Sequence, residues 1–227
     1  MANVKSIRDL WFYSNLAFII NYSITIFRLF VYIPIPYLPS FFNNIFLLVS
    51  YSVTILSLVK KVGSSGFTFK KILSNQNFIC LGLFIFFVPN ILLFPFFLLS
   101  IFHVNGDILA RKKEFEKFFF FDLCVFLGRN AANIGRMAMI CEILLIPVSL
   151  VMVLFRRLNI LPFLVYCTIV RQQYITNKTM KSVVGEAVMR IDGIFAKMPV
   201  EVVAYYDKIK DFVGKYNKGE DEPKKSE

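Results

Sequence analysis

Side chains capable of acid–base chemistry are few in this sequence. The single histidine, His103, is followed four residues later by Asp107, a spacing that puts both on one face of a helix. They could act as an acid and base pair, but we expect a hydrogen bond at a membrane boundary. Glu142 is the one acid within the apolar residues 137–155, and an intramembrane carboxylate is a candidate functional group. Since Arg136 lies within two helical turns, we expect a structural role at head-group level.

The remaining chemistry-bearing residues form no recognisable site. Four cysteines, Cys80, Cys124, Cys141 and Cys167, are scattered through apolar segments, with no CxxC spacing and no histidine partner. This pattern predicts neither a metal site nor a disulfide framework. Neither a phosphate-binding loop nor a Ser/His/Asp order is present, so we expect no catalytic residue, no cofactor and no metal. The sequence predicts a protein that is not an enzyme.

The composition indicates an integral membrane protein. Hydrophobic residues make up 57% of the chain, Phe occurs 27 times, and the mean hydropathy is +0.62. Soluble domains carry about 45–50% apolar residues. Phe, Leu and Ile form long runs without charge, as expected where the solvent is hydrocarbon. We predict an all-α integral membrane protein, made of helical transmembrane hairpins plus C-terminal amphipathic helices.

A first hairpin is predicted over residues 10–59, which carry one charge, Arg28. As a single helix this segment would be about 75 Å long, more than twice the hydrocarbon thickness of about 30 Å. It must therefore fold back on itself. Pro34, Pro36 and Pro39 remove backbone donors midway and mark the turn.

A second hairpin is predicted over residues 72–110, with its break at residues 88–90. A single kinked helix over residues 78–102 is the alternative, since membrane helices tolerate proline. Basic clusters flank the segment, in residues 60–71 on one side and 111–113 on the other. A hairpin keeps both clusters in the cytosol, as the positive-inside bias prefers, whereas one span would force a cluster into the lumen.

A third hairpin is predicted over residues 137–174, with Arg156 and Arg157 at its turn. Luminal arginines violate the charge bias, so we expect both halves to be shallow, with the arginines reaching a head-group layer. The preceding residues 111–136 place phenylalanines at helical spacing with charges between them. This segment is either an interfacial helix or a helix packed on its neighbours.

The C-terminal quarter is denser in charge, and its apolar residues recur with the period of a helix. The pattern predicts two amphipathic helices, the second beginning at Pro199. They either lie on the membrane surface or form a small cytosolic bundle, and their acidic residues weaken an attraction to anionic lipid. The predicted membrane-surface residues are Met180, Val184, Val188, Ile191, Phe195, Val203, Tyr206, Ile209 and Val213.

The last residues, 217–227, are polar and charged and are predicted to be disordered. Lys224 and Lys225 resemble the cytosolic dilysine retrieval signal of endoplasmic reticulum membrane proteins, which a coat protein reads. The net charge of +11 sits mainly in membrane-flanking loops, so no nucleic-acid partner is expected. The predicted divisions are a cytosolic N-terminus (1–9), first hairpin (10–59), basic cytosolic loop (60–71), second hairpin (72–110), interfacial or cytosolic segment (111–136), third hairpin (137–174), cytosolic amphipathic helices (175–216) and tail (217–227).

The block of residues 133–155, followed by 161–166, resembles the transmembrane protein 33 family, which includes the fungal pore-membrane and Tts proteins. The sequence departs from the family after residue 166, where its Arg-Tyr pair is spread over residues 171–174, and residues 10–59 match only in general hydrophobicity. The matching residues are Glu142, Ile143, Pro147, Pro162, Phe163 and Tyr166.

The resemblance implies a multi-pass protein of the endoplasmic reticulum and nuclear envelope that shapes tubular or pore membrane. It also implies work with reticulon-type proteins and association with nuclear pore complexes. Shallow hairpins and surface helices take up more area in the cytosolic leaflet, which favours curvature. The alternatives are a scaffold that recruits a partner through its C-terminal helices, or a small transporter or channel subunit. A transporter needs several facing intramembrane ionisable groups, and only Arg28 and Glu142 are available.

Overall fold

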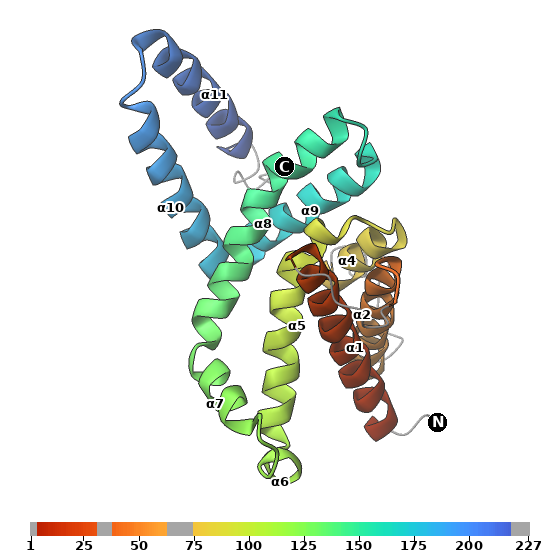
Figure 1. Ribbon diagram of the computed structural model, residues 1–227. Coiled ribbons are helices and arrows are strands. Elements are labelled where there is room, and N and C mark those ends of the chain that lie inside the picture. Colours follow the sequence, from red (N-terminus) through yellow and green to blue (C-terminus); the bar gives the residue numbers. More distant parts are fainter. Residues whose placement is uncertain (1–3, 31–37, 63–74, 219–227) are drawn as a thin grey trace, which may run out of the picture. The chain divides into compact units, whose positions relative to one another are not determined.

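The computed structural model describes residues 4–30, 38–62 and 75–218, and these residues form helices and no strand. The chain divides into two compact units, Met1–Lys181 and Ser182–Glu227. The helices are α1 (Val4–Phe30), α2 (Phe41–Val62), α4 (Gln76–Ile85), α5 (Asn90–Ala110), α6 (Lys112–Phe115), α7 (Phe121–Arg129), α8 (Ala131–Leu154), α9 (Ile160–Thr176), α10 (Lys178–Phe195) and α11 (Val200–Lys218) (Figure 1).

Four of these helices are long and apolar enough to span a membrane: α1, α2, α5 and α8. Their apolar stretches are 20 to 24 residues long, about 30–36 Å of helix against a hydrocarbon layer of about 30 Å. On α8, Leu144, Val148 and Val151 recur every three to four residues and are exposed. An apolar helix face of this kind is stable against lipid and costly against water. The chain is therefore all-helical, with the elements of a multi-pass membrane protein.

The break between α4 and α5 falls at residues 86–89, so residues 78–102 form two helices. Phe86 and Phe87 donate their backbone N–H groups to the last turn of α4, and Phe87 takes a positive φ of 48° that ends the helix. Pro89 directly precedes α5, where its missing N–H costs nothing. Pro95 lies within α5 without ending it. Of the first predicted turn, Pro34 and Pro36 lie outside the described residues.

α1 runs antiparallel to both α5 and α2. Along the polar contacts, residue numbers increase on α1 and decrease on the neighbouring helix, which shows that the helices are antiparallel. The contacts to α5 join Arg8 to Asp107, Asn15 Oδ1 to Ser100 Oγ (3.0 Å) and Tyr22 Oη to the carbonyl oxygen of Asn90 (2.9 Å). The contacts to α2 join Asn15 Nδ2 to Ser50 Oγ (2.6 Å) and Asn21 Nδ2 to Asn43 Oδ1 (2.8 Å).

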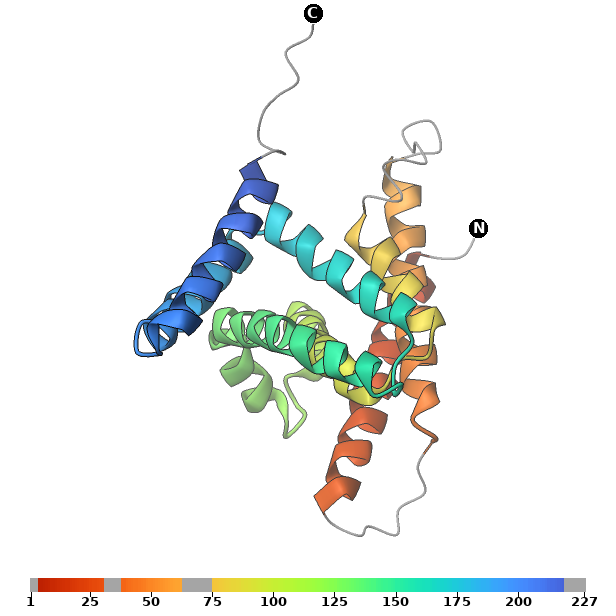
Figure 2. The same ribbon diagram turned by 90° about the horizontal axis from the view of Figure 1, so that it is seen from above.

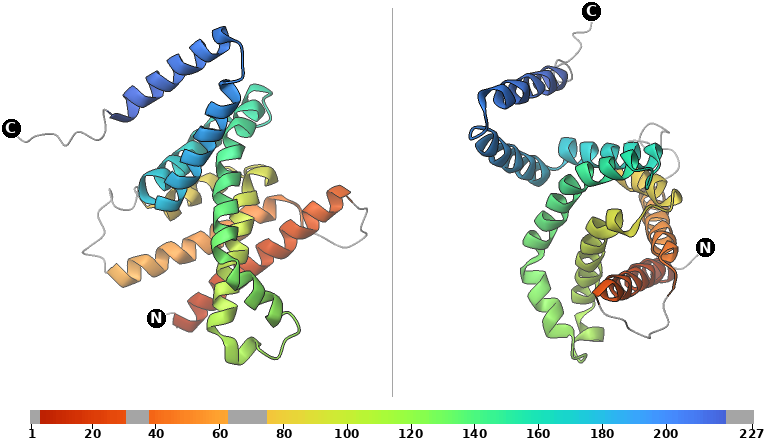
Figure 3. Two further views of the ribbon diagram at one scale, coloured as in Figure 1. Left: turned by 90° about the vertical axis from the view of Figure 1, so that its left-hand side faces the viewer. Right: turned by 45° about the horizontal axis from the view of Figure 1, so that its top comes forward.

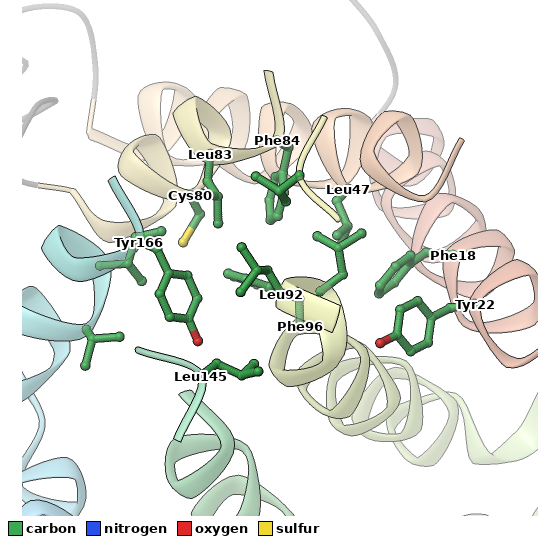
Figure 4. Packing of buried hydrophobic residues seen from close by; sticks show 14 of the residues in the cluster. Phe18, Tyr22, Leu47, Cys80, Leu83, Phe84, Leu92, Phe96, Leu145 and Tyr166 are labelled. Carbon is green, nitrogen blue, oxygen red and sulfur yellow. The ribbon is translucent and has the colours of Figure 1, made fainter. Parts of the chain in front are cut away.

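The main apolar core lies where α1, α2, α4, α5, α8 and α9 meet (Figure 4). The Phe84 and Phe96 rings pack edge to face with centroids 4.9 Å apart, a favoured aromatic geometry. Phe18 from α1 and Tyr166 from α9 are completely buried in the same cluster. These side chains come from both halves of the first unit, so the core ties its helices into one body.

α8 packs along α5, and α9 turns back onto α8 and α4 (Figures 2 and 3). The turn between α8 and α9 is tight, since the N–H groups of Arg157 and Leu158 both donate to the carbonyl oxygen of Met152. Arg156 has a φ of 56°, the left-handed conformation that closes many helix C-termini. Arg156 and Arg157 are both exposed.

In the second unit, α10 and α11 pair through their side chains. The Phe195 and Tyr206 rings stack with centroids 4.2 Å apart. The Asp192 carboxylate accepts hydrogen bonds from Tyr206 Oη at 2.6 Å and Lys210 Nζ at 2.7 Å. α11 begins at Val200, directly after Pro199, the position at which the sequence predicts a second helix.

Candidate functional site

An ionic cluster joins the start of α1 to the end of α5, and we call this end of the first unit the Arg8 end. Asp107 Oδ1 accepts from Arg8 Nε at 2.6 Å, and Asp107 Oδ2 accepts from Arg111 Nε at 2.8 Å. Arg111 also reaches Asp9 at 3.3 Å. Because the Asp107 side chain is only 7% exposed, its charge depends on these two arginines. The cluster locks the two helices in register.

The hydrogen bond expected between His103 and Asp107 is not made. Asp107 turns to its two arginines, and the His103 ring instead packs edge-on against Trp11, with centroids 6.1 Å apart. Helical spacing placed the two residues on one face correctly, but a charged guanidinium is the stronger partner for a carboxylate. The long-range contact from Arg8 therefore decides the role of Asp107.

The segment of α6 and α7 packs against the Arg8 end on one side. The Arg111 guanidinium lies over the rings of Phe12 and Phe115, 4.7 and 5.7 Å from their centroids. Cys124 is buried with Phe12 in a second small core. A Cβ on Gly128 would lie 2.7 Å from a methyl group of Leu109, so a larger residue there would have to displace the end of that side chain. On this face the segment packs on its neighbours, which is one of the two alternatives that the sequence leaves open for residues 111–136.

The opposite side of the same segment is apolar and exposed. Phe119 is 96% exposed, and Phe118, Leu123 and Phe126 are each more than half exposed. Lys112, Lys113 and Lys117 are exposed along the same stretch. Aromatic residues beside lysines are typical of elements that lie in the head-group layer. We call these four residues the α7 apolar face. Figure 1 labels the neighbouring helices α6 and α7.

Glu142 lies in the middle of α8, where this helix packs against α9, and is 1% exposed. Its Oε1 accepts from Gln173 Nε2 at 2.9 Å, and its backbone carbonyl accepts from Tyr166 Oη at 3.1 Å. Its Oε2 is buried without a hydrogen-bond partner among the described residues. The carboxyl group is enclosed between α8 and α9, so Glu142 has a structural environment, and its expected depth at head-group level stays a prediction.

The residues that carry the family resemblance are brought together only in part. Tyr166 is completely buried against Glu142, and Pro162 is buried at the start of α9. Ile143 and Phe163 pack at the edge of the main core, while Pro147 is exposed in the interior of α8. The motif therefore forms a packing junction between two helices rather than an open site.

The predicted surface stripe on the C-terminal helices is interrupted at its start. Met180 is completely buried in the core of the first unit, because α10 begins within that unit, so Met180 does not face a membrane surface. Val188 and Ile191 are exposed, while Val184, Phe195, Val203 and Tyr206 are half-buried. The side chains of Ile209 and Val213, and the whole of Lys224 and Lys225, lie outside the described residues.

Amide side chains inside the apolar helices form contacts that the sequence did not predict. Asn43 Nδ2 donates to Asn90 Oδ1 at 3.1 Å, which extends the contact from Asn21 into a chain of three asparagines on α1, α2 and α5. Asn44 donates to the carbonyl oxygen of Val88 at 3.1 Å in the α4–α5 break. Asparagine within an uncharged run is the available signal, since a buried amide must find a partner.

Comparisons with protein-family models, with curated proteins and with solved structures find no match to this chain. What the chain does is therefore inferred from its own residues and geometry.

Proposed function

We propose that this chain is a non-enzymatic membrane protein of the endoplasmic reticulum and nuclear envelope that shapes or stabilises curved membrane. The α7 apolar face is the observation that carries the proposal. It presents phenylalanines outward at the Arg8 end, on a segment that Arg111 and Cys124 fix to the helices behind it. The residues that resemble the transmembrane protein 33 family support the same function.

The physical route is insertion of side chains into one leaflet. Rings that enter the head-group layer push lipids apart in that leaflet, which favours curvature toward it. Lys112, Lys113 and Lys117 attract anionic head groups, but the exposed carboxylates on the same segment, Glu114, Glu116 and Asp122, offset most of that attraction, so the apolar rings provide the main contribution. Because the α7 segment is held rigidly, its rings cannot retreat from the lipid as those of a loose loop could.

The C-terminal helices serve either as a second surface element or as a docking site for partners. The exposed Val188 and Ile191 and the 81%-exposed Val200 support both uses. Reticulon-type proteins and nuclear pore components are the partners that the resemblance favours. The proposed topology places both termini in the cytosol. Retrieval through Lys224 and Lys225 stays a prediction.

The test is reconstitution of the full chain into liposomes, followed by measurement of vesicle and tubule diameters by electron microscopy. Phe119→Ser combined with Leu123→Ser removes two members of the α7 apolar face and should widen the structures toward those of protein-free liposomes. In liposomes of zwitterionic lipid, where these charges contribute little, Glu116→Gln combined with Asp122→Asn changes two exposed charged side chains of the same segment and should leave the diameters unchanged. Wild-type proteoliposomes as wide as protein-free ones would overturn the proposal.

A further inference from the structure

A cavity of about 550 Å³ lies among α1, α2, α4 and α5 at the Arg8 end. Its volume is in the range of pockets that hold small ligands, about 300–1,000 Å³. The lining on α1 extends from Ile7 to Asn15, a rise of eight residues or about 12 Å along the helix. The cavity therefore has a mouth beside the ionic cluster and a floor deeper in the bundle.

The charges along the cavity are of one sign. Arg8 and Lys60 line it, and none of the described lining residues is acidic. Arg8 directs two of its five N–H groups at Asp107, which leaves three for a ligand. Lys60 is exposed and has no ion pair with any described residue. Arg8 shares its charge with Asp107, so Lys60 supplies the unbalanced positive charge, and the mouth favours an anion over a cation.

The deeper walls carry uncharged polar groups. Asn15, Ser50 and Ser100 form a hydrogen-bonded floor and are each no more than 3% exposed. Above them, the side chains of Ser57 and Asn77 make no hydrogen bond to the described residues around them. An acyl chain would strand these groups without partners, whereas a hydroxylated ligand would satisfy them.

We propose that this cavity binds a phosphorylated polyol head group, with the phosphate between Arg8 and Lys60 and the hydroxyl groups against Ser57, Asn77 and the polar floor. The guanidinium and ammonium groups supply the donors that a phosphate needs. The proposal does not depend on membrane shaping. The same chemistry could arrive on a lipid or as a soluble phosphate ester.

The experiment uses the full chain in detergent micelles and the fluorescence of Trp11, the single tryptophan, which itself lines the cavity. Dioctanoyl phosphatidylinositol 4-phosphate is titrated against dioctanoyl phosphatidylcholine, and deacylated glycerophosphoinositol 4-phosphate is titrated alone. Lys60→Gln tests the mouth and Asn77→Ala tests the wall. Lys197→Gln is the matched control, because Lys197 is also exposed and basic but does not line the cavity.

We expect the phosphoinositide to bind in preference to phosphatidylcholine. Lys60→Gln should weaken its binding about tenfold or more, while Lys197→Gln should leave it unchanged. Equal binding of the deacylated compound would support a soluble ligand, and binding of the acylated compound alone would support a lipid. Equal affinity for phosphatidylcholine would overturn the proposal. So would equal effects of Lys60→Gln and Lys197→Gln, each checked for an unchanged helical spectrum.

Discussion

Asp107→Asn is the substitution that most directly tests how α1 and α5 are held together. The change keeps the shape of the side chain but removes its charge. It leaves Arg8 and Arg111 facing each other across a neutral amide, with Asp9 and the exposed Glu114 as the nearby carboxylates for Arg111. The amide retains one acceptor oxygen, so one of the two guanidinium groups loses its hydrogen bond.

The expected cost follows from the burial of the three side chains. Breaking a buried ion pair costs about 3–5 kcal/mol, whereas an exposed pair contributes about 0–1 kcal/mol. Asp107 is 7% exposed and Arg111 16%, which is near the buried limit, but Arg8 is 50% exposed and partly screened by solvent. We therefore expect Asp107→Asn to lower the free energy of unfolding by about 2–3 kcal/mol.

The assay is reversible unfolding of the full chain in mixed micelles, followed by circular dichroism and by the fluorescence of Trp11, which lies beside the cluster. Glu114→Gln is the control, since this carboxylate is 64% exposed and 3.9 Å from Arg111. The control should change the free energy of unfolding by less than about 0.5 kcal/mol. Equal effects of the two substitutions would refute the view that Asp107 anchors the helices.

Three further outcomes are expected. Gln173→Leu leaves the Glu142 carboxyl group without a donor among the described residues and should lower the free energy of unfolding by about 1–2 kcal/mol in the same assay. The double variant Gln173→Leu with Glu142→Leu should cost less, because it also removes the unpaired carboxyl group. The hydrogen bond from Lys210 lowers the pKa of Asp192 below its ordinary value of 3.8. The Asp192 carboxylate should therefore contribute fully to α10–α11 pairing above pH 3.8 and lose that contribution as the pH falls through the lowered pKa. Carboxyl chemical shifts measure that midpoint, and Lys210→Gln should raise it. Asn15→Leu removes hydrogen bonds to α2 and α5 and should cost about 0.6–1.7 kcal/mol in the micelle assay, whereas no loss would show that the amide contributes nothing.

The sequence predicts the helical class and the main breaks because these depend on local properties. Uncharged runs longer than a bilayer must fold back, and Pro89 marks where α4 gives way to α5. The start of α8 at Ala131 is earlier than residue 137, where the apolar run begins, because helix continues through residues that need not face lipid. The charged turn at Arg156 likewise falls between two helices, as its position between apolar runs predicts.

Roles that depend on distant partners could not be predicted in this way. Helical spacing paired His103 with Asp107, but the carboxylate binds Arg8, which is 99 residues away in the chain. Glu142 was placed by its neighbour in sequence, yet Gln173, 31 residues on, holds it inside the bundle. Met180 fits an amphipathic stripe and is nevertheless buried. Periodicity shows which face of a helix is apolar, but not what covers that face.

The sequence alone determined that this chain is helical and carries segments long and apolar enough to span a membrane, because hydropathy and proline act on each segment separately. Only the tertiary structure decided what its few polar groups do. Asn15 and Asp107 gain their partners from α2, α5 and α1 once those helices pack antiparallel. The same packing leaves the α7 apolar face uncovered and opens a cavity with Arg8 and Lys60 at its mouth. Side-chain partners in an apolar bundle depend on which helices pack together, and residue spacing within one helix does not contain that information.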